Sequence, residues 1–321
     1  MILQNIAIII IFGAILTTLI YKFLSKKLAV FSQSVRTDVL AHHSNKEGTP
    51  TMGGFFLILP ILALPLITGF NLKTLSIIFA VFAFAKIGAL DDFLKIKRGR
   101  GKGLSAKHKT MLMLSATIIN LSILYFSDNS LSSWLLPFSH KYYNLGIASW
   151  PLAILVVLGT ANSVNLTDGL DGLALMPSAI VFLALALIAC VFGNTTVAYA
   201  AALLFGSSMA LLWFNVYPAK IFLGDTGSLA IGAVIAILAL NLNFALILPL
   251  IGWLFVIETM SVILQVISFK LFKRRIIKMS PIHHHFELLG WHECNVVSRF
   301  WVLNLLIVVF IMLLEVASWL H

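Results

Sequence analysis

Long runs of apolar residues, separated by short polar stretches, recur along the whole 321-residue chain. Of all residues, 60% are hydrophobic and 11% are charged, whereas soluble domains carry about 25% charged residues. Each of ten runs is long enough to predict a membrane-spanning helix. They cover roughly 2–20, 53–70, 74–92, 110–127, 147–164, 173–192, 196–214, 226–241, 244–268 and 300–320. The pattern therefore predicts an all-α integral membrane protein, with residues 1–321 as one polytopic domain.

The positions of Lys and Arg predict the orientation of these spans. Nineteen of the 22 Lys and Arg residues lie in odd-numbered loops, whereas the even-numbered loops contain only Lys73 and Lys141. Because cytoplasmic loops of membrane proteins are enriched in Lys and Arg, we expect the odd loops in the cytoplasm and both termini outside. Merging the eighth and ninth spans would place the cations of 270–278 on the wrong side, so residues 241–243 are predicted to form a tight turn. The net charge of +10 then reflects orientation and not nucleic-acid binding.

Acidic residues are scarce, and five of the 12 lie in three short motifs at span edges. The motifs are DDFLK at 91–95, NLTDGLDG at 165–172 and LGDTGS at 223–228. Two more polar stretches, KEGTPTMGG at 46–54 and PIHHHFE at 281–287, also border odd loops. A carboxylate near a membrane is costly unless a cation or ligand accompanies it. Five such stretches on one membrane face predict a cytoplasmic site.

Each acidic motif has a structural and a functional interpretation. On a helix Asp91 and Asp92 lie four and three residues before Lys95, so an ion pair at the helix end is one reading and a cation or phosphate site is the other. Asp168, Asp171 and Asp225 stand where helices begin, and Asp is a good helix N-cap. The glycines beside them would also let backbone approach an anionic ligand closely.

Two other groups of polar residues are candidates for function. The three consecutive residues His283–His285 cannot all face one metal from a regular helix, so contact with phosphate or sugar hydroxyls is the better interpretation. Glu258, Ser261 and Gln265 share one stripe of the ninth span. An intramembrane Glu indicates either a functional site or an interhelical hydrogen bond, and the sequence leaves both open.

Carboxylates for Mg²⁺, cations for phosphates and glycine turns for close approach together favour phosphoryl transfer. The membrane setting suggests that one substrate is a lipid phosphate. A secondary transporter is less compatible, because coupling-ion sites lie near the midplane of paired repeats. A lipid-binding scaffold would need the lysines but not the acids.

The five motifs, in this order over essentially the whole chain, resemble the polyprenyl-phosphate N-acetylhexosamine-1-phosphate transferase superfamily, and most closely its muramoyl-pentapeptide branch through PIHHHFE. The resemblance implies ten transmembrane helices in the bacterial inner membrane, a cytoplasmic active site and a homodimer. It implies the Mg²⁺-dependent reaction of UDP-MurNAc-pentapeptide with undecaprenyl phosphate, which gives lipid I and UMP. A sister enzyme that uses UDP-N-acetylglucosamine is the nearest alternative.

The resemblance also assigns residue roles. Asp225 would bind Mg²⁺, and Asp91 and Asp92 would receive or orient the lipid phosphate. The residues expected to bind phosphates, nucleotide or sugar are Lys46, Thr51, Lys95, Lys107, Asn165, Asp168, Asp171, Asn215, Phe222, His283, His284 and His285. A phosphate monoester is mostly dianionic at neutral pH, so direct attack needs no strong base. The alternative is a covalent phospho-aspartate on Asp91 or Asp92.

Overall fold

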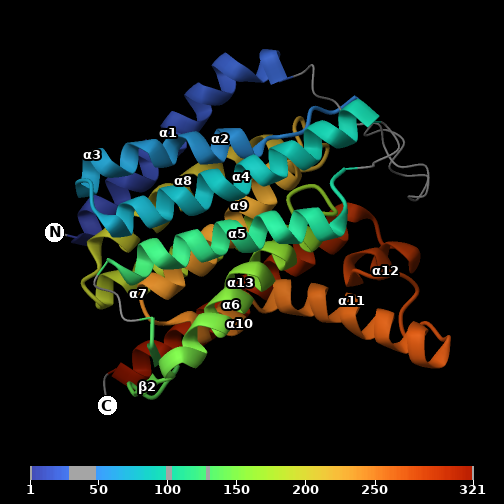
Figure 1. Cartoon of the computed structure of the whole chain (residues 1–321). Helices are drawn as coiled ribbons and strands as arrows, with labels where there is room; N and C mark the ends of the chain where they lie inside the picture. The colour runs from blue at the N-terminus through green and yellow to red at the C-terminus, as the bar shows by residue number, and fades with distance from the viewer. Residues whose placement is uncertain (1, 29–47, 99–102, 128–130, 320–321) are drawn as a thin grey trace.

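The computed structural model describes residues 2–28, 48–98, 103–127 and 131–319, and these parts of the chain are mainly helical (Figure 1). The long helices lie side by side. They are α1 (Ile2–Leu28), α4 (Leu72–Arg98), α5 (Ala106–Tyr125), α6 (Ser149–Thr167), α7 (Leu175–Val191), α8 (Thr195–Asn215), α9 (Gly224–Asn241), α11 (Trp253–Phe272) and α13 (Glu293–Trp319). In Figure 1 the far end of α11 extends away from the other helices.

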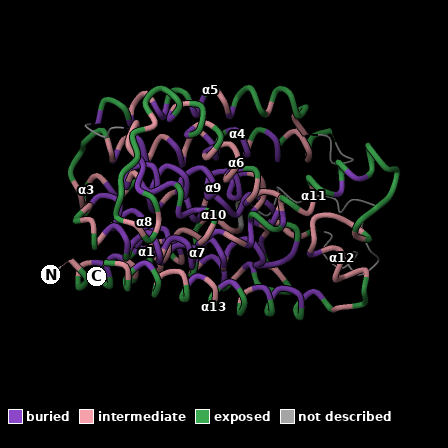
Figure 2. Tube along the Cα trace, turned by 90° about the horizontal axis from the view of Figure 1, so that it is seen from below, coloured by how far each residue is buried: buried purple, intermediate pink, exposed green. Residues whose placement is uncertain are grey.

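Helix α9 forms the centre of the bundle, as the buried residues in Figure 2 indicate. From Thr226 to Asn241 every residue of α9 is buried. It packs against α4, α6 and α7. Small residues make this possible, since a Cβ at Gly232 would lie 2.6 Å from the Cα of Ala161 in α6. Helices in a membrane gain most of their association energy from such close packing.

Two of the predicted spans are interrupted helices. The segment predicted at 53–70 consists of α2 (Gly54–Ile58), the 3₁₀ helix η2 (Leu59–Ala63) and α3 (Leu64–Thr68). Proline near the start of η2 and of α3 removes a backbone donor at each junction. The segment predicted at 244–268 begins with η4 (Ala245–Ile247) and α10 (Leu248–Ile251), and α11 follows after Gly252. The predicted turn between the eighth and ninth spans lies after α9, where Asn243 has a φ of +54°.

The helical character agrees with the sequence prediction, and in the described parts of the chain six helices are long and apolar enough to cross a membrane. They lie at Ile2–Ser25, Gly146–Thr167, Thr195–Asn215, Gly224–Asn241, Trp253–Phe272 and Glu293–Trp319. Shorter apolar helices lie at Gly54–Thr68 and Leu175–Val191. The protein is thus a multi-pass helical membrane protein. That the chain crosses the membrane ten times stays a prediction.

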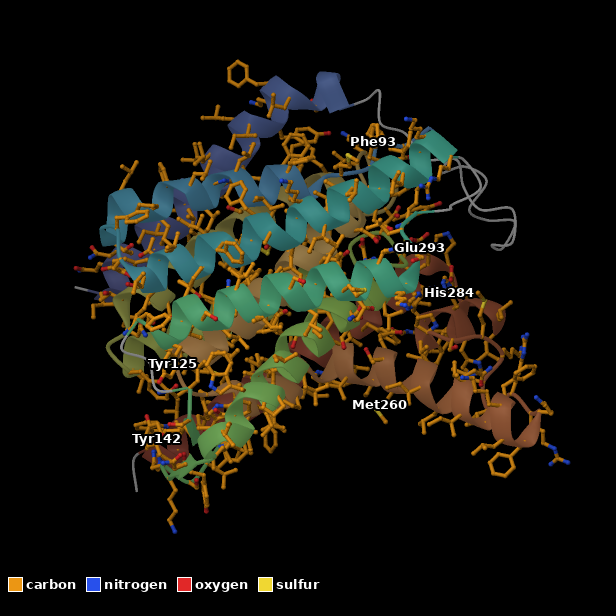
Figure 3. The ribbon with its side chains drawn as sticks, in the orientation of Figure 1. Phe93, Tyr125, Tyr142, Met260, His284 and Glu293 are labelled. Carbon is orange, nitrogen blue, oxygen red and sulfur yellow. The ribbon has the colours of Figure 1, made fainter. Side chains whose placement is uncertain are left out.

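The two ends of the bundle differ. At one end, strands β1 (Ser133–Leu135) and β2 (Tyr142–Asn144) form an antiparallel hairpin, followed by the 3₁₀ helix η3 (Gly146–Ala148). Figure 3 shows Tyr125 and Tyr142 at this end, and Phe93, His284 and Glu293 at the other. Phe93 belongs to the first acidic motif, and His284 lies in the short helix α12 (Ile282–Leu288). The polar motifs therefore gather at the end opposite the hairpin.

Candidate active site

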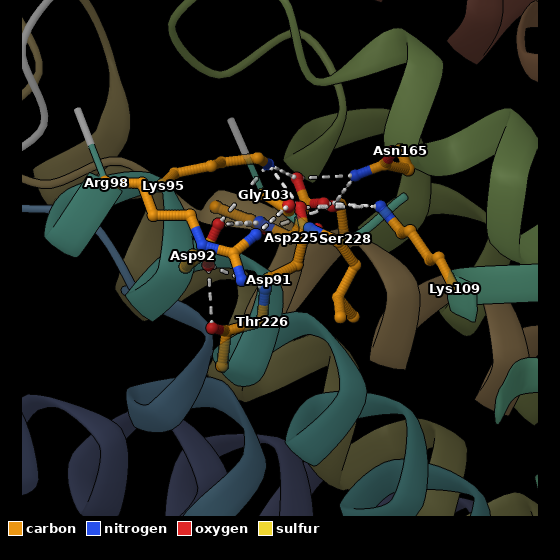
Figure 4. Close-up of polar contacts among 12 residues, drawn as sticks. Asp91, Asp92, Lys95, Arg98, Gly103, Lys109, Asn165, Asp225, Thr226 and Ser228 are labelled. Atoms are coloured by element: carbon orange, nitrogen blue, oxygen red, sulfur yellow. Dashed lines mark hydrogen bonds and ion pairs between the residues drawn. The ribbon is translucent and has the colours of Figure 1, made fainter. Parts of the chain in front are cut away.

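The site lies where the end of α4 meets the beginning of α9 (Figure 4). The two backbones touch at Gly88, where a Cβ would lie 2.1 Å from the carbonyl oxygen of Asp225. One turn further along α4, the carboxylate of Asp92 accepts hydrogen bonds from the backbone N–H of Asp225 (3.2 Å) and of Thr226 (3.0 Å), and from the Thr226 hydroxyl (2.8 Å). Free N–H groups at a helix N-terminus favour a negative charge. Asp92 thus anchors the first turn of α9 to α4.

This packing brings three carboxylates together. Oxygen atoms of Asp91, Asp92 and Asp225 all lie within 4.8 Å of one another. Asp91 and Asp92 are buried, and the side chain of Asp225 is 14% exposed. At an effective dielectric constant near 20, two negative charges at this separation repel each other by about 3 kcal/mol. Such a cluster therefore requires compensating positive charge.

Two lysines supply that charge in the structure. The ammonium group of Lys95 lies 2.7 Å from Asp91 Oδ2 and 2.9 Å from Asp225 Oδ1. Lys109, from the first turns of α5, forms an ion pair with the other oxygen of Asp225 and lies 3.9 Å from Asp91 Oδ2. The Asp91 carboxylate also accepts a hydrogen bond from the N–H of Leu104 at 2.6 Å. Asp225 is consequently held between cations from two different helices.

The end of α6 contributes amide and carboxyl groups to the same place. Asn165 donates through Nδ2 to Asp225 Oδ1 (3.1 Å) and to the Ser228 hydroxyl (2.8 Å). Asp168 follows α6 directly as its C-terminal cap residue. Burial, together with the negative charges of Asp225, Asp92 and Asp171, raises the pKa of Asp168 to about 8. The structure thus places Asn165 and Asp168 beside the carboxylate cluster.

The segment before α2 forms another wall of the site. Backbone hydrogen bonds pair it with the chain before α9: Phe222 N–H donates to Pro50 O and Gly53 N–H donates to Phe222 O, both at 2.8 Å. Gly224 has a φ of +71°, and a Cβ there would lie 2.8 Å from the Thr51 hydroxyl and 2.7 Å from Asp92 Oδ2. Thr51 is therefore buried next to the carboxylates, and Phe222 is held beside it with a partly exposed side chain.

Asp171 and Asn215 hold backbone in place. Asp171 accepts a hydrogen bond from Ala219 N–H at 3.0 Å, and its own N–H donates to Glu293 Oε1 at 2.8 Å. Asn215 accepts from Gly172 N–H at 3.1 Å and donates to Ile221 O at 2.9 Å. These contacts tie the loop after α6 to the turn between α8 and α9. Their predicted contacts with nucleotide stay predictions.

The histidines lie on α12 in three different environments. His283 is fully buried, and its Nδ1 lies 3.0 Å from Glu258 Oε2 on α11. His284 is partly exposed, with Nδ1 2.7 Å from Glu287 Oε2. His285 accepts a hydrogen bond from Lys278 N–H at 3.2 Å. The interhelical contact that the sequence left open for Glu258 is therefore present.

The lysines that the sequence predicted as phosphate ligands do not all lie at the carboxylate cluster. Lys46 lies outside the described residues. Lys107 is exposed and forms no ion pair with the three carboxylates within the described parts of the chain. Sequence reasoning missed Lys109, which contacts Asp225 and Asp91, and it also missed Thr226 and Ser228. The predicted phosphate contact of Lys107 stays a prediction.

The residues present fit a divalent metal ion such as Mg²⁺. Magnesium prefers carboxylate oxygens in octahedral geometry with bonds of about 2.1 Å, so opposite ligands lie about 4 Å apart. The spacing of the three carboxylates is close to this value. Both oxygens of Asp92 already accept N–H groups of α9. Asp91 and Asp225 are therefore the better placed ligands, and the lysine ammonium groups now occupy positions where a cation is favourable.

Comparison with known proteins first defines the class. Residues 74–243, which contain all three acidic motifs, match the model of glycosyl transferase family 4. This stretch runs from α4 to the turn after α9.

Individual relatives then specify the family. The phospho-N-acetylmuramoyl-pentapeptide-transferase of Clostridium kluyveri is 42% identical over 300 residues, 92% of each chain. The enzymes of the same name from Heliobacterium modesticaldum and Halalkalibacterium halodurans are 44% and 42% identical, over 86% and 89% of each chain. The chain belongs to the phospho-N-acetylmuramoyl-pentapeptide-transferase family, and it is a transferase.

Proposed function

We propose that this protein transfers phospho-MurNAc-pentapeptide from UDP-MurNAc-pentapeptide to undecaprenyl phosphate, giving lipid I and UMP in peptidoglycan synthesis. The observation that carries the proposal is the cluster of Asp91, Asp92 and Asp225 with Lys95 and Lys109 at one end of the bundle. It supplies ligands for a divalent cation and two cations for phosphates, as phosphoryl transfer between anions requires. The names of the relatives favour the muramoyl-pentapeptide donor over UDP-N-acetylglucosamine.

The proposal includes a membrane topology with ten spans. With odd loops in the cytoplasm, the acidic motifs face the compartment that contains nucleotide sugars. The exposed cations Lys107, Lys270 and Lys273 then also lie on the cytoplasmic side, where anionic lipid head groups attract them. A homodimer is part of the same proposal.

An apolar groove supports a lipid acceptor. A cavity of about 220 Å³ lies between α6, α7, α9, η4, α10 and α11 and extends to Ser163, two residues before Asn165. Its lining is nearly all apolar, with Leu155, Val181 and Phe255 among its residues. Beside it, α11 exposes large apolar side chains such as Ile263 and Ile267. A polyprenyl chain in this groove would keep its phosphate near the carboxylate cluster.

We infer direct transfer. An oxygen of the lipid phosphate attacks the phosphorus linked to the sugar, and the bond from that phosphorus to the bridging diphosphate oxygen breaks, so that UMP leaves with the electron pair. Mg²⁺, when bound, would neutralise the charge of the diphosphate. Lys95 and Lys109 would offset the charge of the two substrates, and Asn165 would hold Asp225 in position. A dianionic lipid phosphate needs no general base.

The test is release of UMP by the purified protein in detergent, with undecaprenyl phosphate and either nucleotide sugar. We expect UMP only with the muramoyl-pentapeptide donor and only with Mg²⁺. The Asp225→Asn variant should lose activity by about 100-fold or more, as removal of one electrostatic group at a reaction centre does. Activity only with UDP-N-acetylglucosamine would transfer the assignment to the sister enzyme. A stable labelled phospho-enzyme formed from donor without lipid would refute direct transfer.

A further inference from the structure

We propose that Glu258 is a positioning residue for the donor nucleotide sugar, acting through His283 on the loop that carries Asp168. The inference rests on the proposed function and identifies a residue that the reaction scheme above does not use. Glu258 is fully buried in α11, away from the carboxylate cluster. Its single side-chain partner among the described residues is the imidazole of His283.

The contact fixes the state of the histidine ring. His283 Nδ1 and Glu258 Oε2 lie 3.0 Å apart, within hydrogen-bond distance. We assign the proton to Nδ1, because a carboxylate oxygen is an acceptor. Both side chains have no exposed surface. In a buried site a hydrogen bond to a charged group is among the stronger contacts. The ring is therefore held in one orientation, with Nε2 pointing away from α11.

The Nε2 edge of the ring lies directly against the loop after α6. A Cβ added to Gly169 would lie 2.3 Å from Nε2, 2.9 Å from Cε1 and 3.3 Å from Cδ2. Nε2 is buried and has no hydrogen-bond partner among the described residues. Gly169 directly follows Asp168, and it is the lack of a side chain that lets the ring approach. Glu258 thus holds the ring of His283, and this ring packs against the backbone of the loop at Gly169.

The same loop is held from the other side by different residues. Asp171 and Gly172 are bound to Ala219 and Asn215 in the turn before α9. Glu293 and Trp301 of α13 also bind the backbone of Asp171 and Gly172. The loop is therefore held by α12 at Gly169, and by the end of α8, the α8–α9 turn and α13 at Asp171 and Gly172. Loss of the Glu258 support should loosen Asp168 and Gly169 without separating the helices. Because none of the residues of this loop lines the apolar groove, the affinity for the donor should change more than the affinity for the lipid.

The variants separate this role from simple stabilisation of the fold. Glu258→Leu removes both oxygens, whereas Glu258→Gln keeps an acceptor for the Nδ1 proton. Thr259→Val is the matched control, since the adjacent Thr259 hydroxyl has no hydrogen-bond partner among the described residues. For each variant, KM for the nucleotide sugar and for undecaprenyl phosphate is measured, together with the folded fraction and the thermal shift produced by UDP.

We expect Glu258→Leu to raise the donor KM by about tenfold or more, the effect of losing one hydrogen bond to a charged group. Glu258→Gln should raise it less, and the lipid KM should stay within about twofold. In a His283→Gln background, Glu258→Gln should have no additional effect. If Glu258→Leu does not fold, the Gln variant and this double variant decide the question.

Three results would overturn the inference. They are an unchanged donor KM in both Glu258 variants, an equal rise of both KM values, and an undiminished effect of Glu258→Gln in the His283→Gln background. If the wild-type protein releases no UMP from either donor, the proposed function fails first. The thermal shift with UDP then still reports whether Glu258 supports nucleotide binding.

Discussion

Asp92 and Asp225 are neighbours in the site, yet the structure predicts that their replacement by Asn has different consequences. Asp92 is 1% exposed and accepts three hydrogen bonds from the first turn of α9. The contacts of the Asp225 carboxylate are with side chains, among them those of Lys95, Lys109 and Asn165. Asp92→Asn should therefore loosen the first turn of α9 and lower both stability and activity, whereas Asp225→Asn should lower activity and leave that turn bound to α4.

The size of the stability effect follows from the contacts of Asp92. An Asn has one acceptor oxygen, and its NH₂ group would face backbone donors of α9. The loss of one or two hydrogen bonds to a charged group costs about 1.5–3 kcal/mol each, and the lost charge at the helix N-terminus costs about 0.3–1 kcal/mol. Removal of the Asp92 charge also ends its repulsion with Asp225, which stabilises the folded state by about 3 kcal/mol at most. With two hydrogen bonds lost, these terms sum to a net destabilisation of about 0.3–4 kcal/mol.

Thermal unfolding in detergent, followed by tryptophan fluorescence, measures the stability of each variant, and UMP release measures its activity. Thr226→Val serves as the control, since it removes one of the three hydrogen bonds and leaves the carboxylate intact. Its transition temperature should lie between those of the wild type and Asp92→Asn. The reasoning is refuted if Asp92→Asn unfolds at the wild-type temperature, or if Thr226→Val is destabilised more than Asp92→Asn.

Three further predictions use other parts of the site. Lys109→Met should reduce the rate of UMP release by about tenfold or more, whereas Lys107→Met should change it less than about twofold; the reverse order would show that the lysine in the site was wrongly identified. Gly88→Ala should destabilise the protein by about 1–3 kcal/mol or prevent folding, because its Cβ would collide with the backbone of α9, whereas Gly159→Ala, which meets nothing within 4 Å, should unfold at or above the wild-type temperature. Because the pKa of Asp168 is raised to about 8, ionisation of this carboxyl destabilises the folded state. This destabilisation is absent below pH 4, grows as the pH rises to 8 and is then constant. Asp168→Asn should therefore gain in transition temperature over the wild type between pH 4 and 8, and a difference that does not depend on pH would contradict the raised pKa of this carboxyl.

Much of the architecture could be predicted from hydropathy and charge. Each of the ten apolar runs contains helix, and the turn after α9 lies where the charge distribution requires it. The breaks inside the second and ninth runs were not predicted, although Pro60, Pro65 and Pro249 stand there. A single proline in an apolar run does not reveal whether a helix kinks or ends, because neighbouring helices satisfy the freed backbone groups.

The convergence of Asp91, Asp92 and Asp225 follows from topology, since all three lie at span ends on the same predicted side. Their separate contacts do not follow from it. Which carboxylate receives the N-terminus of α9 depends on how α4 and α9 pack at Gly88, where the backbones are in contact. The sequence shows that a glycine stands at position 88, but it does not show which residue of α9 this glycine contacts.

The choice between Lys107 and Lys109 shows what a closer reading of periodicity could have added. The buried positions of α5 are 113, 116, 117, 120, 121 and 124, a stripe with helical spacing. Continued one turn toward the N-terminus, the stripe reaches 109 and not 107. This buried stripe is hard to recognise in the sequence for two reasons. It includes the polar residues Thr117 and Asn120, and apolar residues such as Met111 and Ile118 are exposed instead. In a membrane helix the lipid-facing side is as apolar as the core, so hydrophobicity alone does not indicate rotation. Polar residues at helical spacing do, and Lys109, Thr117 and Asn120 are such a set.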